Sequence, residues 1–290
     1  MSARDELAPE LRRLAALGWD ADDFPLTPDG VRVAGAATDG HYPESGLEVL
    51  GLDTGSGYWY DHRASEVIDS LTAATDARSI WDIGAGTGAM CVRFARAGFE
   101  VVAVEPIRDG AVAIAAQGSG PVFCGSLESL ELPPRSVPIV GLFDVIEHLD
   151  DPHALLSEVR RVLQPDGVVA ITVPAFRSLW SSNDDASGHQ RRYTTKELNR
   201  FMAASGFSPV TARYIFATLL LPAVALRALP YRLGRRPPAE QVIAAASREL
   251  EPSPSIDRAL RSALRAEHAV STRVRLPAGL SVLGIYRARP

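Results

Sequence analysis

A glycine-rich stretch from Ser79 to Met90, reading SIWDIGAGTGAM, carries the residue types and spacing that most clearly indicate chemistry. Three alternating glycines follow an apolar segment, and they let a ligand approach the backbone of a turn ahead of helix N–H groups. Asp82 adds a carboxylate, which repels a phosphate and suits a ligand with cationic or hydroxyl groups. The turn is therefore a candidate cradle for a nucleotide cofactor, with Asp82, Gly84, Ala85, Gly86, Thr87 and Gly88 as its candidate residues.

The turn alone fits two kinds of cofactor. Gly84, Gly86 and Ala89 match the pattern of NAD and FAD binding, whereas Asp82 suits the aminoacyl end of S-adenosylmethionine. A second apolar run ends at Glu105, about 20 residues beyond the turn, where a carboxylate can accept both ribose hydroxyls. Because ribose occurs in both cofactors, Glu105 leaves the choice open.

Four motifs lie in succession: DIGAGTG at 82–88, Glu105, FDVIEHL at 143–149 and LQPDG at 163–167. In kind and order they resemble those of the class I S-adenosylmethionine-dependent methyltransferases, and the resemblance covers roughly residues 58 to 214. The resemblance implies S-adenosylmethionine as the cofactor and direct in-line methyl transfer. Positioning of the two reactants can supply about 7 to 11 kcal/mol of the acceleration of such a reaction.

The same resemblance implies further cofactor contacts. The backbone of Phe143 and Asp144 would face the methionine part, and the segment after the third strand would contact adenine. An aromatic and basic cluster at residues 58–63, YWYDHR, either covers the cofactor or is a packing helix. Outside the glycine turn, the candidate cofactor residues are Tyr58, Arg63, Glu105, Pro106, Ser126, Leu127, Phe143 and Asp144.

A polar loop, SSNDDASGHQRRY, ends in a His-x-Arg-Arg-Tyr block that resembles a bacterial subgroup of this family. The resemblance places the loop over the acceptor pocket. His189 is then a candidate general base, because histidine titrates near neutral pH. Arg191 and Arg192 could clamp an anionic group of the acceptor. Tyr193 and His148 complete the candidate catalytic set, although a solvated loop histidine and local structure are the alternatives.

The elements that must position these residues alternate between strands and helices. Apolar runs predict strands at 79–83, 100–105, 121–124, 138–144 and 167–173, with helices near 88–97, 107–117 and 152–163. A capped helix at 194–205 and strands at 207–214 and 280–288 follow. Runs without polar alternation indicate a parallel sheet covered on both faces. We expect an α/β, Rossmann-like, doubly wound seven-stranded sheet whose last strand is antiparallel, as the resemblance implies, with a helical insertion before that strand.

Three regions are expected along the chain. Residues 1–56 form a partly irregular N-terminal extension with a short helix at 6–17, residues 57–214 and 279–290 form the methyltransferase core, and residues 215–278 form a helical, basic insertion. The segment 214–226, YIFATLLLPAVAL, has no charge and precedes several arginines. It is shorter than the about 20 residues that span a bilayer. It could be a core helix, a membrane-surface anchor within 214–236, or a wall for an apolar acceptor.

Composition excludes several classes of function. The net charge of −5 argues against nucleic-acid binding, although residues 215–290 carry twelve Arg against five acidic residues, a local +7 that leaves −12 for residues 1–214. The two cysteines have no metal-ligand spacing, so no metal is expected. The N-terminus has no apolar signal region, and we expect a cytoplasmic location with possible membrane association.

These observations favour an S-adenosylmethionine-dependent methyltransferase of a small molecule, such as a natural product or a lipid-linked saccharide. An NAD-dependent oxidoreductase and a noncatalytic cofactor-binding scaffold are the alternatives. The sequence gives no indication of the oligomeric state, of the acceptor or of the atom that is methylated.

Overall fold

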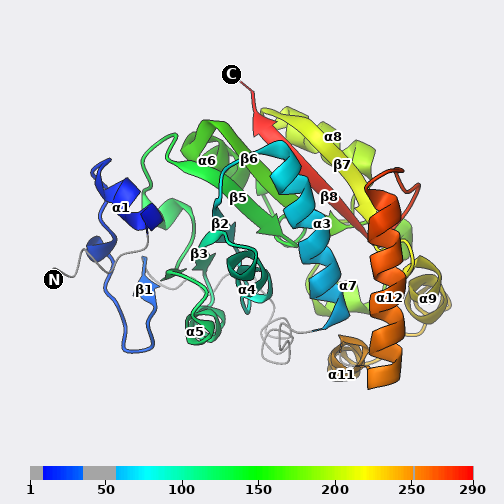
Figure 1. Ribbon diagram of the computed structural model, residues 1–290. Helices are drawn as coiled ribbons and strands as arrows, with labels where there is room; N and C mark the ends of the chain where they lie inside the picture. Colours follow the sequence, from blue (N-terminus) through cyan, green and yellow to red (C-terminus); the bar gives the residue numbers. More distant parts are fainter. Residues whose placement is uncertain (1–8, 35–56, 251, 290) are drawn as a thin grey trace.

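The computed structural model describes residues 9–34, 57–250 and 252–289, and in it a twisted sheet lies between two groups of helices (Figure 1). The described strands run in the order β1-β4-β3-β2-β5-β6-β8-β7. Their bounds are Arg32–Val33 (β1), Ser79–Ile83 (β2), Glu100–Glu105 (β3), Val122–Cys124 (β4), Val137–Phe143 (β5), Leu163–Pro174 (β6), Phe207–Ile215 (β7) and Ser281–Ala288 (β8).

The central strands are parallel, and the C-terminal strand is antiparallel to both of its neighbours. β2 pairs with β3 and β5, and β5 pairs with β6, all in parallel, whereas β8 pairs with β6 and β7 in antiparallel register. Every residue of β2 is buried, as expected for a strand covered on both faces. The predicted doubly wound sheet with its antiparallel last strand is confirmed, and the carboxyl ends of β2, β3, β5 and β6 meet at one edge.

One face of the sheet is covered by α3 (Tyr58–Ala74), α4 (Ala89–Arg96), α5 (Arg108–Gln117) and α12 (Pro254–Ser271). Their apolar side chains, among them Leu71, Phe94, Ile114 and Leu264, pack in one buried cluster with residues of the strands. This layer therefore joins the predicted core helices to α12 of the insertion.

The other face is covered by α1 (Pro9–Ala15), α6 (Pro152–Val162) and α8 (Thr195–Ala204), with Leu14, Leu156 and Leu198 in a second buried cluster. α8 begins and ends as its sequence predicts. Thr194 and Glu197 form a reciprocal capping box at its start, and Gly206 follows its end with φ of 87°.

The sheet has one strand more than the seven expected. β1 adds to β4 in parallel, and the N–H of Ala34 donates to the carbonyl of Cys124 at 2.9 Å. Trp19 anchors this region, since its indole N–H donates to the carbonyl of Leu130 at 2.7 Å and its ring packs edge-on against Trp81. A strand of two residues is too short to show a hydrophobic period, so the sequence does not predict β1. Residues 6–8 of the expected first helix lie outside the described residues.

The insertion begins with a broken helical segment in place of one regular helix. It comprises α9 (Leu220–Ala223), the π-helical turn η5 (Val224–Ala228) and α10 (Leu229–Arg232), and α11 (Ala239–Leu250) follows before α12. Leu221 is 78% exposed and Leu226 is 72% exposed, so the core-helix interpretation of this segment is wrong. None of the helices in the described ranges is long and apolar enough to cross a bilayer.

Short helices complete the described elements. They are η2 (Ala21–Asp23), η3 (Glu128–Leu130), η4 (Arg177–Leu179) and α7 (Ser182–Ala186). α7 follows β6 and carries the polar loop to the carboxyl edge of the sheet, where the glycine turn also lies.

Candidate active site

The glycine turn joins β2 to α4 with its backbone in the left-handed region. Gly84, Gly86 and Gly88 have φ of 70°, 60° and 81°. A Cβ atom on Gly84 would lie only 2.9 Å from Cγ2 of Val145. The turn therefore requires glycine for both its conformation and its space. A cleft of about 280 Å³ opens above it, lined by Trp59, Tyr60, Arg63, Asp82, Gly84, Ala85, Gly86, Thr87, Ala89, Met90, Phe143, Asp144, His148, Ser187 and His189.

Asp82 lies at the end of β2 beneath this cleft. The thiol of Cys91 donates to Oδ2 of Asp82 at 3.2 Å, while Oδ1 has no hydrogen-bond partner among the described residues. Burial raises the pKa of Asp82 to about 7, although the Cys91 hydrogen bond and the charge of Arg63 act in the opposite direction. A buried carboxylate with an unused oxygen suits a ligand that brings an ammonium or hydroxyl donor.

Glu105 holds the glycine turn in place. Its two oxygens accept the backbone N–H of Gly86 at 2.7 Å and of Ile107 at 2.9 Å. Burial raises the pKa of Glu105 to about 7 despite these two bonds. Glu105 is absent from the lining of the cleft, so its expected contact with ribose stays a prediction.

Ser126 and Leu127, which are expected near adenine, and Pro106, a further candidate cofactor residue, also lie outside the lining of this cleft. The carbonyl of Pro106 faces the thiol of Cys124, and Ser126 exchanges hydrogen bonds with Ser129. Leu127 is buried in the core. Their contact with the cofactor likewise stays a prediction.

The start of α3 forms one wall of the cleft. Nη2 of Arg63 lies 2.5 Å from Oδ2 of Asp144, and its guanidinium lies over the rings of Trp59 and Tyr60, 5.5 and 5.8 Å from their centroids. Tyr58 turns away, since its hydroxyl donates to the carbonyl of Glu249 at 3.0 Å. The aromatic cluster thus borders the cleft as expected, but through Trp59 and Tyr60 and without Tyr58.

Asp144 directly follows β5 with φ of 58°, a conformation that non-glycine residues rarely adopt. The hydroxyl of Thr172 donates to its Oδ1 at 3.1 Å, while Arg63 binds Oδ2. Backbone strain of this kind persists where the surrounding structure enforces it, and it is often found at functional sites. Phe143 and Asp144 both line the cleft.

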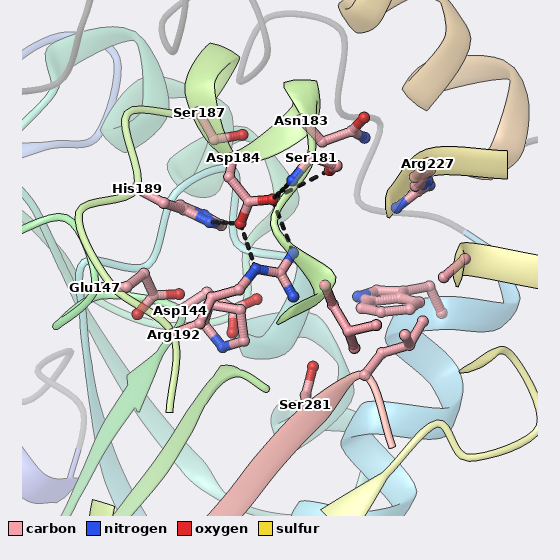
Figure 2. Close-up of a pocket in the computed structure, with 15 residues that line it drawn as sticks. Asp144, Glu147, Ser181, Asn183, Asp184, Ser187, His189, Arg192, Arg227 and Ser281 are labelled. Atoms are coloured by element: carbon pink, nitrogen blue, oxygen red, sulfur yellow. Dashed lines mark hydrogen bonds and ion pairs between the residues drawn. The ribbon is translucent and has the colours of Figure 1, made fainter. Parts of the chain in front are cut away.

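Asp184 organises the polar loop, as Figure 2 shows. Its Oδ1 lies 2.8 Å from Nδ1 of His189 and 2.6 Å from Nε of Arg192, and its Oδ2 accepts Nη2 of Arg192 at 2.9 Å. The backbone N–H of Ser181 adds a further bond at 2.8 Å. Burial alone would raise the pKa of Asp184, but the bonds from His189 and Arg192 outweigh it and lower the pKa to about 2.

The sequence prediction did not single out Asp184. A signal was available, because Ser181 and Asp184 have the spacing of a capping box, and they form one at the start of α7. That spacing predicts only the start of a helix. The bonds to His189 and Arg192 form because the loop after α7 folds back onto Asp184.

Three residues of the His-x-Arg-Arg-Tyr block, Gln190, Arg191 and Tyr193, line neither this cleft nor the second pocket described below. Nη2 of Arg191 donates to the carbonyl of Leu149 at 2.7 Å, and Nε2 of Gln190 donates to the carbonyl of His148 at 3.0 Å. Tyr193 is buried in the core, where burial raises the pKa of its hydroxyl to about 12. The expectation that Arg191 and Tyr193 line the acceptor pocket is therefore corrected: Arg191 ties the polar loop to the segment after β5, and Tyr193 packs beneath it.

A second pocket of about 140 Å³ adjoins the cleft above the glycine turn. It is lined by Trp59, Asp144, Glu147, Pro174, Leu179, Ser181, Asn183, Asp184, Ser187, His189, Arg192, Ala223, Arg227, Leu280 and Ser281. The two cavities share Trp59, Asp144, Ser187 and His189. His189 and Arg192 line this second pocket, and the roles toward an acceptor that the sequence gives them stay predictions. Trp59, Glu147 and Arg227 also line it, and the sequence assigns them no such role.

Glu147 lines the second pocket and His148 lines the cleft, so both lie near the residues that the two cavities share. Burial, with the charge of Asp144 adding to it, raises the pKa of Glu147 well above its ordinary value. Burial likewise lowers the pKa of His148 to about 4, so that its imidazole is neutral at physiological pH. The ring of His148 packs edge-on against that of His189, with 4.8 Å between centroids.

Comparison with known proteins supports the sequence resemblance. A model of a family described as a methyltransferase domain matches residues 45–212, which is more than half of the chain. An uncharacterized methyltransferase of Mycobacterium sp. (strain JLS) is 32% identical over 152 residues, which cover 48% of this chain and 60% of the relative. The match thus spans less than two thirds of the relative's own length.

Two solved structures share the fold at low sequence identity. Phosphoethanolamine N-methyltransferase 2 of Haemonchus contortus, solved with S-adenosyl-L-methionine, superposes with a TM-score of 0.50 and 15% identity, covering 79% of this chain and 52% of that one. The cyclase SpnF gives a TM-score of 0.51 and 15% identity over 79% of this chain and 80% of its own. Similarity at this level shows the fold alone, because one fold can support different reactions.

Proposed function

The chain belongs to the methyltransferase-domain family, and from this premise we propose that it is an S-adenosylmethionine-dependent methyltransferase of a small, hydroxyl-bearing molecule. The observation that carries the proposal is the junction of the two cavities. A cleft above the glycine turn and a second, polar pocket share Trp59, Asp144, Ser187 and His189. A donor in one cavity and an acceptor in the other would meet at these four residues.

The residues of the cleft fit the cofactor. The glycine turn leaves a space that a Cβ atom would fill, and Asp82 has an unused buried oxygen for the ammonium or a hydroxyl of the cofactor. Arg63 also lines the cleft and supplies a cation suited to the methionine carboxylate. The family match favours a sulfonium donor over a dinucleotide, which decides between the two cofactors that the turn alone left open.

His189 is proposed as the group that takes the acceptor proton. Held by Asp82 and Arg63, S-adenosylmethionine would supply a methyl group on a sulfonium, and its transfer to an acceptor hydroxyl would leave the C–S electron pair on sulfur and a proton to be removed. Asp184 binds Nδ1 of His189 and so leaves Nε2 to accept that proton. The polar loop therefore supplies an oriented base next to the cleft.

The lining of the second pocket supports a polyhydroxylated acceptor. Ser181, Asn183, Ser187 and Ser281 supply hydroxyl and amide groups that can bond to sugar hydroxyls. Trp59 adds an indole ring to the lining, and stacking on Phe216, with 3.8 Å between ring centroids, holds that ring in place. A saccharide, free or lipid-linked, and a hydroxylated natural product share this chemistry.

A peripheral membrane contact through residues 214–236 forms part of the proposal. Ala223 and Arg227 line the second pocket, while the same segment exposes Leu221, Leu226 and Leu233 to solvent. Several arginines follow these leucines, and each basic residue near an anionic leaflet can contribute about 1 kcal/mol. One segment would then touch both the lipid surface and the head of a lipid-linked acceptor.

Titration calorimetry with S-adenosylhomocysteine tests the cofactor part of the proposal, and an absence of binding at high micromolar concentration would overturn it. Cell extract incubated with methyl-labelled S-adenosylmethionine then tests turnover. We expect His189→Gln to abolish product formation while leaving S-adenosylhomocysteine affinity within a few-fold of wild type. His153→Gln is the matched control, because His153 is an exposed histidine outside both cavities. Cofactor binding without product from any extract would favour the scaffold alternative.

A further inference from the structure

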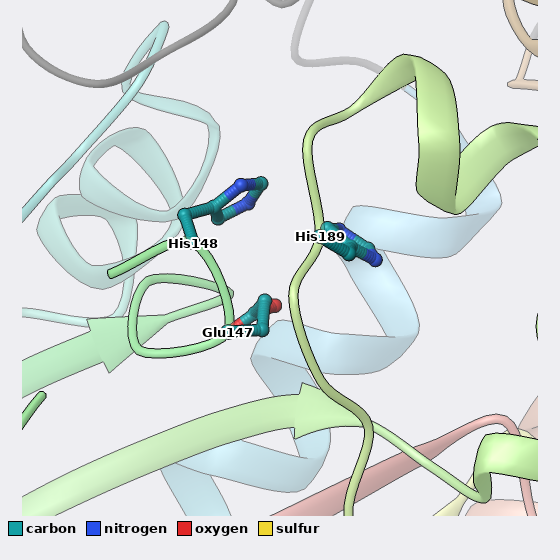
Figure 3. A group of neighbouring side chains, drawn as sticks. All are labelled: Glu147, His148 and His189. Carbon is teal, nitrogen blue, oxygen red and sulfur yellow. The ribbon is translucent and has the colours of Figure 1, made fainter. Parts of the chain in front are cut away.

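Three neighbouring side chains have the chemistry of metal ligands (Figure 3). Each of them lines one or both of the two cavities. They are Glu147, His148 and His189, and one ligand atom from each lies within 4.8 Å of the other two. Glu147 and His148 follow β5, and His189 comes from the loop after α7. Residues 41 positions apart in the chain are thus brought together, which no spacing rule for metal sites would detect.

Glu147 is fully buried, and neither of its carboxylate oxygens has a hydrogen-bond partner among the described residues. Its backbone is held firmly, since the N–H of Gln190 donates to the carbonyl of Glu147 at 2.9 Å. A buried carboxyl without a partner is costly, and buried carboxylates are normally hydrogen-bonded, paired with a charge or bound to a metal. No hydrogen bond from a described residue therefore explains the burial of this side chain.

His189 already has the support that metal-bound histidines receive. Nδ1 of His189 lies 2.8 Å from Oδ1 of Asp184, and Arg192 holds the same carboxylate from the other side. A carboxylate on one ring nitrogen fixes the orientation of the imidazole and leaves the second nitrogen for the metal. Glu147 and His148 are held to this loop by Gln190, which bonds to the backbone of both.

We propose that Glu147, His148 and His189 bind one divalent transition-metal ion of the kind that Zn²⁺ represents. Two imidazoles and one carboxylate form a ligand set that suits such ions, and three protein ligands leave a coordination position open. Glu147 lines the acceptor pocket, His148 lines the cofactor cleft, and His189 lines both. The open position would therefore face the place where donor and acceptor meet.

The role of the ion rests on the proposed methyltransferase function. A bound cation can orient an acceptor hydroxyl and make it more acidic, so that its proton passes to water. Nε2 of His189 would then be a ligand, and its role as a base belongs to the metal-free protein. The two roles exclude each other in any one molecule, and metal dependence distinguishes them.

Binding is measured on the full chain after removal of metals with a chelator, by titration calorimetry with Zn²⁺ and by the visible absorption of Co²⁺ as a spectroscopic probe. We expect one equivalent of Zn²⁺ to bind, and we expect its affinity to fall at least about tenfold in Glu147→Gln and in His148→Gln. His153→Gln is the control for adventitious binding to surface histidines, and it should bind Zn²⁺ as wild type does.

The same samples are titrated with S-adenosylhomocysteine, which separates the two proposals. Retained S-adenosylhomocysteine affinity in Glu147→Gln, together with lost Zn²⁺ affinity, supports the metal site and shows that the variant is folded. Equal Zn²⁺ affinity in wild type and in both site variants, or no binding to wild type, overturns the metal site alone. Wild-type protein that binds Zn²⁺ but not S-adenosylhomocysteine overturns the methyltransferase function.

Discussion

His189 and Asp184 form a hydrogen-bonded pair at the junction of the two cavities, with 2.8 Å between Nδ1 and Oδ1. The pair is arranged by a loop of only six residues, in which the backbone N–H of His189 also donates to the carbonyl of Asp184 at 2.9 Å. Arg192 binds both oxygens of the same carboxylate, so the charge of Asp184 is shared between a histidine and a guanidinium. The reactive face of His189 therefore depends on a buried ion pair.

Replacing Asp184 by Asn should destabilise the protein strongly. The variant keeps the shape of the side chain but leaves the largely buried guanidinium of Arg192 without a carboxylate. Removing one partner of a buried ion pair costs about 3 to 5 kcal/mol of unfolding free energy, measured here by urea denaturation. Asp185→Asn makes the same change at the next, exposed position and should cost far less. Equal losses in the two variants would refute the organising role of Asp184.

Gly84→Ala should weaken cofactor binding, whereas Gly98→Ala should not. Both glycines have positive φ, 70° and 84°, so each alanine costs about 1 to 2 kcal/mol of stability through backbone strain. At Gly84 the added Cβ would also meet Val145, whereas at Gly98 no described residue beyond its chain neighbours lies within 4 Å of that atom. The difference in S-adenosylhomocysteine affinity between the two variants, measured by calorimetry, isolates the effect at the cleft. Wild-type affinity in Gly84→Ala would show that the turn does not hold the ligand.

The affinity for S-adenosylhomocysteine should fall as the pH falls from 8 to 6, because Asp82 has a pKa of about 7. Below that value the carboxyl is protonated and loses its attraction for the ammonium of the ligand, so affinity falls by up to about tenfold per pH unit. Asp82→Asn should bind more weakly at pH 8 and lose most of this dependence. Glu100→Gln, at an exposed position on β3, is the control and should titrate as wild type does. An unchanged pH profile in Asp82→Asn would assign the dependence to another group, of which Glu105 is the first candidate.

The sequence predicts those features of the fold that depend on neighbours in the chain. The capping box of Thr194 and Glu197 and the buried strand β2 follow from local patterns, and both are confirmed. β1 could not be predicted, because two residues have no period and its partner β4 lies some ninety positions away. The sequence allows three interpretations of the segment after Phe216, because the exposure of its leucines depends on which other elements pack against it.

The candidate site shows the same limit. The sequence identifies the glycine turn, Asp82 and His189, whose residue types and positions are distinctive. It misses Asp184 and leaves Glu147 unassigned, because a charged residue in a polar or helical context is usually solvated. Asp184 and Glu147 are buried next to His189 only because the polar loop folds back toward the segment after β5. The same fold directs Arg191 and Tyr193 away from the pocket, although their neighbour Arg192 lines it.

Glu267 should stabilise the insertion in a pH-dependent way. Its carboxylate accepts the backbone N–H of Ala217 at 3.0 Å and of Thr218 at 2.7 Å. Burial opposes ionisation, but the hydrogen bonds from His62, Thr218 and Ala217 outweigh it and lower the pKa to about 2. A lowered pKa means that the stabilisation is complete above the ordinary value of 4.5 and is lost as the pH falls towards 2.

Glu267→Gln should therefore lower the free energy of unfolding at pH 7 by about 1.5 to 3 kcal/mol, which is typical of hydrogen bonds to a charged group. The difference from wild type should shrink as the pH is lowered from 4.5, where urea denaturation is repeated. Glu240→Gln, at an exposed position in α11, should show neither effect. A constant difference from pH 7 to pH 3 would contradict the assignment to the charge of Glu267.

The exposed leucines of the insertion should bind anionic membranes. Leu226 and Leu233 are 72% and 75% exposed, and the exposed Arg235 and Arg236 follow on the same segment. Apolar side chains enter the headgroup region, and each arginine adds about 1 kcal/mol on an anionic surface, so Arg235→Gln should weaken binding about fivefold. Flotation with phosphatidylglycerol vesicles measures this binding, and the effect of Arg235→Gln should vanish at high salt.

Leu226→Ser should weaken flotation at both low and high salt, because it removes apolar contact and leaves the charge unchanged. Leu17→Ser is the matched control, since Leu17 is a 54% exposed leucine at the end of the N-terminal helix, far from the insertion in sequence. Equal losses of flotation in the two leucine variants would indicate nonspecific hydrophobic adsorption instead of a membrane-docking surface. Wild-type protein that stays at the bottom of the gradient at low salt would contradict the membrane contact altogether, and the acceptor would then have to reach the pocket from solution.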